Sequence, residues 1–179
     1  MAVELSRRVD YPMLDGANIA YYPRIFDLAH RFFEEAWEPM CGVSYPVMIN
    51  ERKIGFPVVH VETDFITPLR YGDTIDATLA IERIGTSSCT WKYLLHNQHG
   101  TLLWTSSQVT VCVNMDTLES QPIPDDLRQG LQEHLLEAEA LLTLILGSQC
   151  EWMMTLLCQP LQSTCLPFAP IQRDQNQSR

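Results

Sequence analysis

The sequence has few basic residues and no long apolar run. Only 12 Lys and Arg stand against 22 Asp and Glu, which gives a formal net charge of −10. Because such a charge repels polyanions, nucleic acid is not an expected partner. The longest apolar stretch runs from Ala140 to Leu146. That is far shorter than the roughly 20 residues a membrane-spanning helix needs, so no membrane association is expected.

The six cysteines form no C-x-x-C pair, and no H-x-H or H-E-x-x-H pattern accompanies them. Metal and redox sites commonly show such spacings, so the sequence predicts no metal site. His96 and His99 flank a predicted hairpin tip without further ligands, and Cys41 has no evident base beside it. The first ten residues lack the apolar run of a signal peptide. We therefore expect reduced thiols and a cytoplasmic protein.

A helix from about Tyr22 to Glu38 is the strongest secondary-structure signal. Pro23 suits its first turn, and Pro39 with Gly42 is expected to close it. Its apolar stripe is wider than a surface helix normally carries, which favours burial against a curved sheet. The stripe consists of Ile25, Phe26, Leu28, Ala29, Phe32, Phe33, Ala36 and Trp37.

Strands are predicted on both sides of this helix in the sequence. A short strand carries Leu5 and Val9 before it, and four alternating strands joined by short turns follow it. The absence of intervening helices predicts an antiparallel meander, and the order of elements predicts an α+β fold. The four strands are expected at residues 56–66, 74–83, 89–97 and 102–114.

The acids Asp125 and Asp126 favour a further helix start near Pro124. This helix is expected to reach His134, and its continuation to Leu146 is left open. We divide the chain into a domain over residues 1–137 and a C-terminal extension over residues 138–179, whose role the sequence does not define. Residues 147–179 show no clean period, and the end of the chain, residues 172–179, is expected to be disordered.

The most informative stretch lies directly before the long helix. Asp15 stands in a turn a few residues ahead of the helix start, where free N–H groups polarise a bound carbonyl. A carboxylate there suits attack on that carbonyl or activation of water. Asn18 tolerates the left-handed backbone that a sharp turn requires. The alternative, on spacing alone, is that Asp15 is a turn or capping residue.

The stretch Asp15–Pro23 resembles the D-x-x-G-I-V-Y-Y-P loop of hotdog-fold acyl-CoA thioesterases, the group that includes 4-hydroxybenzoyl-CoA thioesterase. The run from Phe56 to Phe65, with Pro68 to Asp73, is similar to the strand and P-x-x-x-G-D turn of that family, and residues 83–88 resemble its next hairpin. The blocks occur in matching order over roughly residues 5–134. The resemblance implies a hotdog fold, in which a curved antiparallel sheet wraps around a long central helix.

The resemblance also implies roles for individual residues. Asp15 would be the catalytic carboxylate, as nucleophile or general base, and the backbone N–H of Tyr22 would polarise the thioester carbonyl. No cofactor is implied beyond the coenzyme A of the substrate. Family members form homodimers or homotetramers with active sites at the dimer interface. Two positions depart from the pattern: Met13 replaces a usual Asp, and Asn18 replaces a usual Gly.

Four further residues are implied in substrate binding. His60 would lie near the acyl group; the alternative is a strand histidine facing water or another subunit. Arg83, Gly85 and Ser88 surround a turn where the family touches the nucleotide end of coenzyme A; the alternative is a plain hairpin turn. Glutamates 34 and 35 would suit a hotdog branch with a helix carboxylate, but a solvated face is favoured for them.

The function expected is therefore an acyl-CoA thioesterase, acting on an aromatic or a short- to medium-chain acyl-CoA. Two alternatives stay open. The chain could be a non-catalytic hotdog module that binds an acyl group or acyl carrier, which Met13 and the unmatched extension motivate. It could also be a hotdog dehydratase, which would need His60 paired with Glu62 or Asp64.

Overall fold

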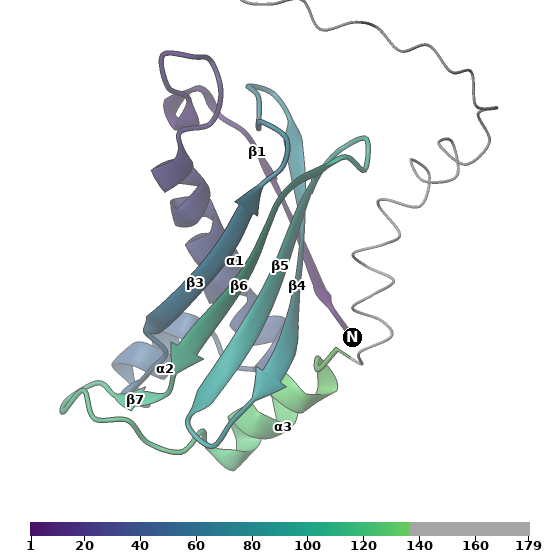
Figure 1. Cartoon of the computed structure of the whole chain (residues 1–179). Helices are drawn as coiled ribbons and strands as arrows, with labels where there is room; N and C mark the ends of the chain where they lie inside the picture. The colour runs from purple at the N-terminus through teal and green to yellow at the C-terminus, as the bar shows by residue number, and fades with distance from the viewer. Residues whose placement is uncertain (137–179) are drawn as a thin grey trace, which may run out of the picture.

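The computed structural model of the protein describes residues 1–136. Its main element is one five-stranded antiparallel sheet with the strand order β1-β4-β5-β6-β3 (Figure 1). The consecutive strands β4, β5 and β6 form a meander as predicted, and the N-terminal strand β1 pairs with β4. The predicted meander does not extend to β3, which pairs with β6 at the opposite edge and not with β4, the next strand in the sequence. The strands are β1 (Val3–Arg8), β3 (Val58–Phe65), β4 (Thr74–Ile84), β5 (Ser88–Asn97) and β6 (Leu102–Val111).

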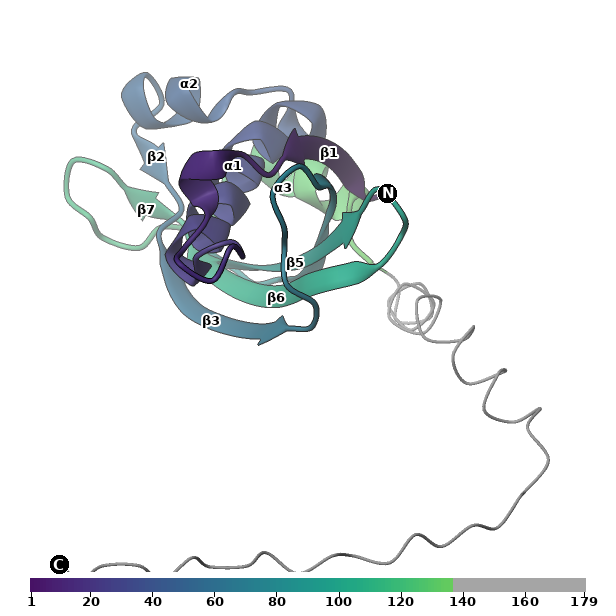
Figure 2. The same cartoon turned by 90° about the horizontal axis from the view of Figure 1, so that it is seen from above.

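Helix α1 (Tyr22–Cys41) runs along the concave side of the sheet, and the view from above shows the strands curving around it (Figure 2). The predicted apolar stripe is the face that it buries: Phe32, Ala36 and Trp37 are fully inaccessible to solvent. Trp37 packs against Phe56 and Trp91, with ring centroids 4.6 and 5.2 Å away. The predicted α+β arrangement, a long helix wrapped by a curved antiparallel sheet, is confirmed.

Helix α1 is longer than predicted at its C-terminal end. Pro39 lies inside the helix and does not end it, because the buried side chain of Met40 anchors one more turn in the core. Gly42 adopts a left-handed conformation with φ of 67°, and its N–H donates to the Glu38 carbonyl at 2.8 Å. This is the C-terminal cap that a glycine supplies without steric cost.

Strand β3 is an edge of the sheet, and this fact governs its exposure. Its apolar residues were predicted to share one face, but Val59, Val61 and Phe65 are 61%, 41% and 53% exposed. A register shift between Val58 and His60 interrupts the alternation. In the described part of the chain, β3 pairs only with β6, so its other edge is open.

Several short elements were not predicted. Tyr11–Met13 forms a 3₁₀ turn instead of continuing the first strand, because Pro12 cannot donate to a ladder. The other two are helix α2 (Tyr45–Asn50) and a two-stranded antiparallel pair formed by β2 (Ile54–Gly55) and β7 (Val113–Asn114).

Helix α3 (Asp125–Glu133) begins at the predicted acids and packs against α1 and β4. Its predicted continuation to Leu146 and the extension from 138 to 179 lie outside the described residues. Within residues 1–136, no helix is long and apolar enough to cross a membrane.

Candidate active site

The loop before α1 is held by a dense set of main-chain hydrogen bonds. The Asp15 N–H donates to the Ile19 carbonyl at 2.9 Å, and the Asn18 N–H donates to the Asp15 carbonyl at 3.1 Å. Asn18 has a φ of 58°, the left-handed conformation that its side chain was predicted to permit. The loop is further tied to the chain entering β4 through the bridge between Ile19 and Arg70. Asp15 therefore stands on a fixed turn.

The side chain of Asp15 makes one hydrogen bond in this turn. Its Oδ1 accepts from the Ala17 N–H at 2.7 Å, which fixes the orientation of the carboxylate. The residue is exposed, and among residues 1–136 no cation lies within ion-pair distance of it. The second carboxylate oxygen is thus left for a ligand or for water. The turn role and the chemical role are compatible, because each uses a different oxygen.

The start of α1 presents a single free donor. Pro23 has no N–H, and the Arg24 N–H is used by the Tyr21 carbonyl at 2.8 Å. The Tyr22 N–H has no acceptor among the described residues. The partial positive charge of the helix end is therefore concentrated on the Tyr22 main chain. A carbonyl oxygen bound there would meet one directed hydrogen bond.

An apolar pocket of about 440 Å³ joins these two groups. Its walls come from the loop, from the first turn of α1 and from the chain that follows β3, so the elements that converge on it are far apart in sequence. The pocket contains both Asp15 and Tyr22, and its apolar walls include Ile25, Phe65 and Leu69. Nearly all of the lining is apolar, so a hydrophobic group would bind beside one carboxylate and one N–H donor.

The backbone bonds of the loop also explain how the site tolerates Met13. The Met13 carbonyl accepts the Tyr21 N–H at 2.8 Å, so this position contributes its main chain. Its side chain is partly buried against the core. The loop geometry therefore does not require the aspartate that the family pattern has at this position.

His60 lies away from this pocket within one subunit. In β3, Val61 pairs with the buried Gln108 and shares the helix-facing side, so His60 faces the opposite, convex side of the sheet. Its Nε2 lies 3.2 Å from an oxygen of Glu62 on the exposed edge strand. The polar face predicted for this strand is present, but it does not line the pocket.

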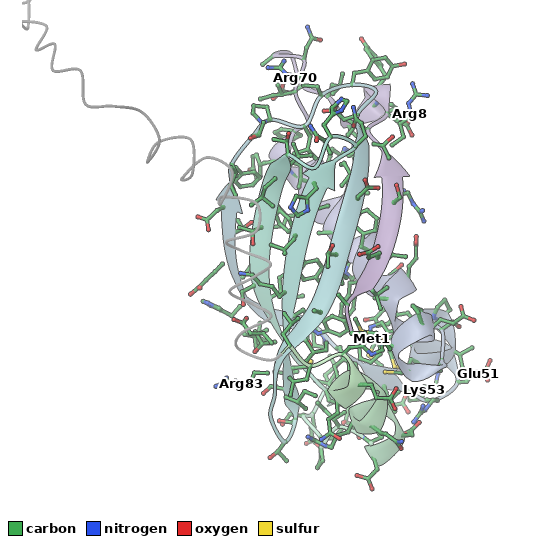
Figure 3. The ribbon with its side chains drawn as sticks, turned by 90° about the vertical axis from the view of Figure 1, so that its right-hand side faces the viewer. Met1, Arg8, Glu51, Lys53, Arg70 and Arg83 are labelled. Atoms are coloured by element: carbon green, nitrogen blue, oxygen red, sulfur yellow. The ribbon has the colours of Figure 1, made fainter. Side chains whose placement is uncertain are left out.

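The other three implied binding residues lie at the far end of the sheet. Strand β4 has 11 residues and spans about 35 Å from the Asp15 end to the turn that carries Gly85. Figure 3 shows Arg83 at one end of the sheet and Arg8 and Arg70 at the other. Arg128 donates to the carbonyls of Gly85 and Thr86, both at 2.8 Å, and so braces this turn. Within this chain, Arg83, Gly85 and Ser88 do not reach the pocket.

The remaining candidates have structural partners. Glu35 forms an ion pair with Arg7, and Glu34 lies 3.3 Å from His30, on the solvated face that was predicted. Burial raises the pKa of the Cys41 thiol to about 12, which makes it a poor nucleophile. No group of three metal-ligating side chains occurs among residues 1–136.

The pocket wall formed by residues 65–69 was not predicted as part of the site. The Pro68–Asp73 block was noted only as a motif, although its hydrogen bond from the Ala20 N–H to the Leu69 carbonyl, at 2.9 Å, is what seats the loop. A signal was present in the sequence, because the motif and the loop are both unusually rich in turn formers. Their contact is a tertiary feature that spacing does not reveal.

A wrapped helix whose N-terminus meets a loop carboxylate beside an apolar pocket defines a hotdog-fold thioester hydrolase. The family comparison agrees: residues 9–131 match the model of the thioesterase-like superfamily. The chain belongs to this superfamily, and the predicted class of enzyme is confirmed at that level.

Curated relatives are similar over most of their length. A 1,4-dihydroxy-2-naphthoyl-CoA hydrolase from Nostoc punctiforme is 23% identical over 141 residues, which cover 78% of this chain and 93% of the relative. The protein of the same name from Prochlorococcus marinus is 27% identical over 135 residues, covering 72% and 89%.

Solved structures share the fold. A 1,4-dihydroxy-2-naphthoyl-CoA thioesterase from Synechocystis superposes with a TM-score of 0.67 at 21% identity, covering 74% of this chain and 97% of the other. A thioesterase superfamily structure from Jannaschia gives a TM-score of 0.71 at 24% identity, covering 76% and 94%. The hotdog fold is thereby confirmed.

Proposed function

We propose that this protein is an acyl-CoA thioesterase that hydrolyses a thioester to the free acid and coenzyme A. The observation that carries the proposal is the shared pocket, which Asp15 and Tyr22 both line, together with a Tyr22 N–H that has no acceptor among residues 1–136. The N–H stabilises the negative charge that develops on the thioester oxygen. Asp15 acts as the nucleophile or as the general base for water. Thiolate departure from the tetrahedral centre then releases coenzyme A. Where water is the attacking group this step leaves the free acid, and where Asp15 attacks it leaves an acyl–Asp15 anhydride that a water molecule hydrolyses to the free acid.

The acyl group we propose is aromatic or otherwise hydrophobic. The pocket wall contains Phe65, Ile25 and Ile19, and Phe65 stands edge-on to Phe26 at a centroid distance of 6.3 Å. Aromatic side chains favour such edge-to-face and stacked contacts with an aromatic ligand. The names of the similar proteins, which specify a naphthoyl-CoA and a gentisyl-CoA, support the same class.

We also propose that the active protein is a dimer formed through β3. The open edge of this strand carries exposed apolar side chains, including Val59 and Val61, and unpaired main-chain groups. An exposed apolar edge strand is a template for pairing with another strand. The pocket lies directly beside it, since Phe65 belongs to both. A second subunit on this edge would close the pocket.

The test is release of free thiol from a panel of benzoyl-, 4-hydroxybenzoyl-, 1,4-dihydroxy-2-naphthoyl- and hexanoyl-CoA. Asp15→Asn is the decisive variant, because an amide oxygen still accepts the Ala17 N–H and preserves the turn. We expect kcat to fall about 10²- to 10⁴-fold. The matched control is Asp116→Asn, an exposed residue whose side chain makes no hydrogen bond among residues 1–136.

Full activity in Asp15→Asn would remove this residue from the mechanism. No thiol release from any member of the panel, with the protein folded, would favour the non-catalytic module. In that case a ligand should raise the unfolding temperature without being hydrolysed.

A further inference from the structure

A second cavity, which the proposed reaction does not use, opens between β1 and α1. Its volume is about 300 Å³. The Asp15 loop separates it from the apolar pocket, since Pro12 and Met13 line this cavity while Asp15 lines the other. We call it the arginine cleft, because its lining includes Arg7, Arg8, Arg24 and Arg31.

The charge of the arginine cleft opposes that of the chain. It gathers four of the 12 basic residues of a protein whose formal net charge is −10. Two carboxylates, Asp10 and Asp27, also line it, so the lining keeps a surplus of positive charge. Positive charges gathered in one cleft repel one another, and a bound anion would relieve that repulsion.

The arginines differ in how far they are already occupied. Arg7 forms an ion pair with Glu35, and Arg24 lies 3.0 Å from Asp27, both on the helix. Among residues 1–136, the only ion pair of Arg8 is a long contact of 3.9 Å with Asp10. The Arg31 side chain makes no hydrogen bond or ion pair with any residue from 1 to 136. Two guanidinium groups are therefore available for a ligand.

Two of the four arginines lie on one face of helix α1. Arg24, Asp27 and Arg31 stand at i, i+3 and i+7, so they line one side of α1 over about 10 Å. Guanidinium groups bind phosphate oxygens through paired N–H donors. Two guanidinium groups at this spacing suit a ligand with two phosphate groups better than one small carboxylate. Such a ligand would displace Asp27 from its ion pair with Arg24.

Two exposed tyrosine side chains, Tyr71 and Tyr11, lie beside the arginine cleft. The Arg8 guanidinium lies 5.6 Å from the centroid of the Tyr71 ring, and Tyr11 stands edge-on to Tyr71 at 6.1 Å. Tyr11 and Tyr71 are 72% and 56% exposed, so the pair is accessible to a flat ligand, which can stack on only one of the two perpendicular rings. Exposed aromatic rings beside arginines are the features that bind a nucleobase next to its phosphates.

We propose that the arginine cleft binds the phosphates of a purine nucleotide, whose base packs against the exposed side of the Tyr71–Tyr11 pair. Two ligands carry these groups. One is the 3′-phospho-ADP end of an acyl-CoA, and the other is a free nucleotide, which would act on the Asp15 loop through Met13 in the wall of the cleft. Binding of the first rests on the proposed thioesterase function, and binding of the second does not.

Calorimetric titration of the full chain with 3′,5′-ADP, coenzyme A and ATP tests the site without any turnover. The variants are Arg31→Gln, which breaks no described contact, and Arg24→Gln/Arg31→Gln. The matched control is Lys53→Gln, a lysine at the opposite end of the molecule (Figure 3). We expect the double variant to weaken nucleotide binding at least tenfold, the single variant to weaken it less, and the control to leave it unchanged. Tyr71→Ala should weaken nucleotides but not inorganic phosphate.

Kinetics then separates the two ligands. A raised KM for acyl-CoA in the double variant, with unchanged hydrolysis of the matching N-acetylcysteamine thioester, assigns the cleft to the substrate, because the shorter thioester has no phosphate. Unchanged KM with lost nucleotide binding assigns it to a free nucleotide. Equal binding of all three nucleotides by the double variant and by Lys53→Gln overturns the proposal, whether or not the protein hydrolyses thioesters.

Discussion

The turn that carries Asp15 depends on one left-handed residue, and replacing that residue tests the loop directly. Asn18 has a φ of 58°. Alanine in this conformation costs about 1–2 kcal/mol, whereas glycine adopts it freely. Alanine recovers about 0.4–1 kcal/mol through the lower entropy of its unfolded chain. We therefore expect Asn18→Ala to be about 1 kcal/mol less stable than Asn18→Gly, a difference of about 4 °C in Tm.

The same strain should lower activity, because the Asn18 N–H holds the Asp15 carbonyl and the Ala17 N–H holds the carboxylate. If the strained turn opens locally, the cost appears as a smaller population of the competent loop. A loss of about 1 kcal/mol lowers the competent population, and with it kcat/KM, by at most roughly fivefold. Thermal unfolding followed by circular dichroism, together with the thiol-release assay, measures both effects.

Helix α2 offers a control position at which the alanine variant, and not the glycine variant, is expected to be the more stable. Asn50 is the exposed last residue of that helix, where right-handed backbone favours alanine over glycine. We expect Asn50→Ala to be the more stable of its pair, with activity unchanged in both. If Asn18→Ala matches Asn18→Gly in Tm and in turnover, the turn does not require a left-handed residue and the reasoning fails.

Three further predictions concern the core. A Cβ on Gly130 would lie 2.5 Å from the Met40 carbonyl oxygen. Gly130→Ala should therefore lower the free energy of unfolding, measured in urea, by about 1–3 kcal/mol. A gain in stability would contradict the close approach of α3 to α1. Because burial raises the pKa of Cys41 to about 12, peptide mapping after iodoacetamide treatment at pH 8 should find it unlabelled in the native protein and labelled in urea. The Trp91 indole N–H donates to Thr110 Oγ1 at 3.1 Å, so Thr110→Val should cost about 1–3 kcal/mol by thermal unfolding, and Thr110→Ser, which keeps an acceptor, should cost less.

The parts of the fold that the sequence predicted are those that depend on local patterns. The wide apolar stripe of α1 requires a concave partner, and the alternation in β4 to β6 provides one. Asp15 and Tyr22 could be paired in advance because only a few residues of one loop separate them. Asn18 was recognised as a left-handed position for the same local reason.

The parts that were not predicted depend on which strand lies at an edge and on the length of the sheet. Period-two alternation in β3 does not reveal that one side of the strand lacks a neighbour, so the exposure of Val59 and Phe65 could not be read from it. The arginine cleft was missed because Arg7 and Arg31 come from different elements. The formal charge of the whole chain, −10, also conceals the local surplus of positive charge in this cleft.

The distance between Asp15 and the Gly85 turn has a consequence for the proposed dimer through the open edge of β3. In one subunit the two lie at opposite ends of β4. A two-fold pairing of β3 with its copy is antiparallel, so it places the far end of one sheet beside the near end of the other. The proposed dimer would therefore bring a second subunit's turn, with Arg83 and Ser88, toward the pocket of the first. A monomeric variant, for which Val61→Lys on the edge is the natural choice, should consequently lose acyl-CoA turnover while keeping nucleotide binding in the arginine cleft, because that cleft is built from β1 and α1 of one subunit.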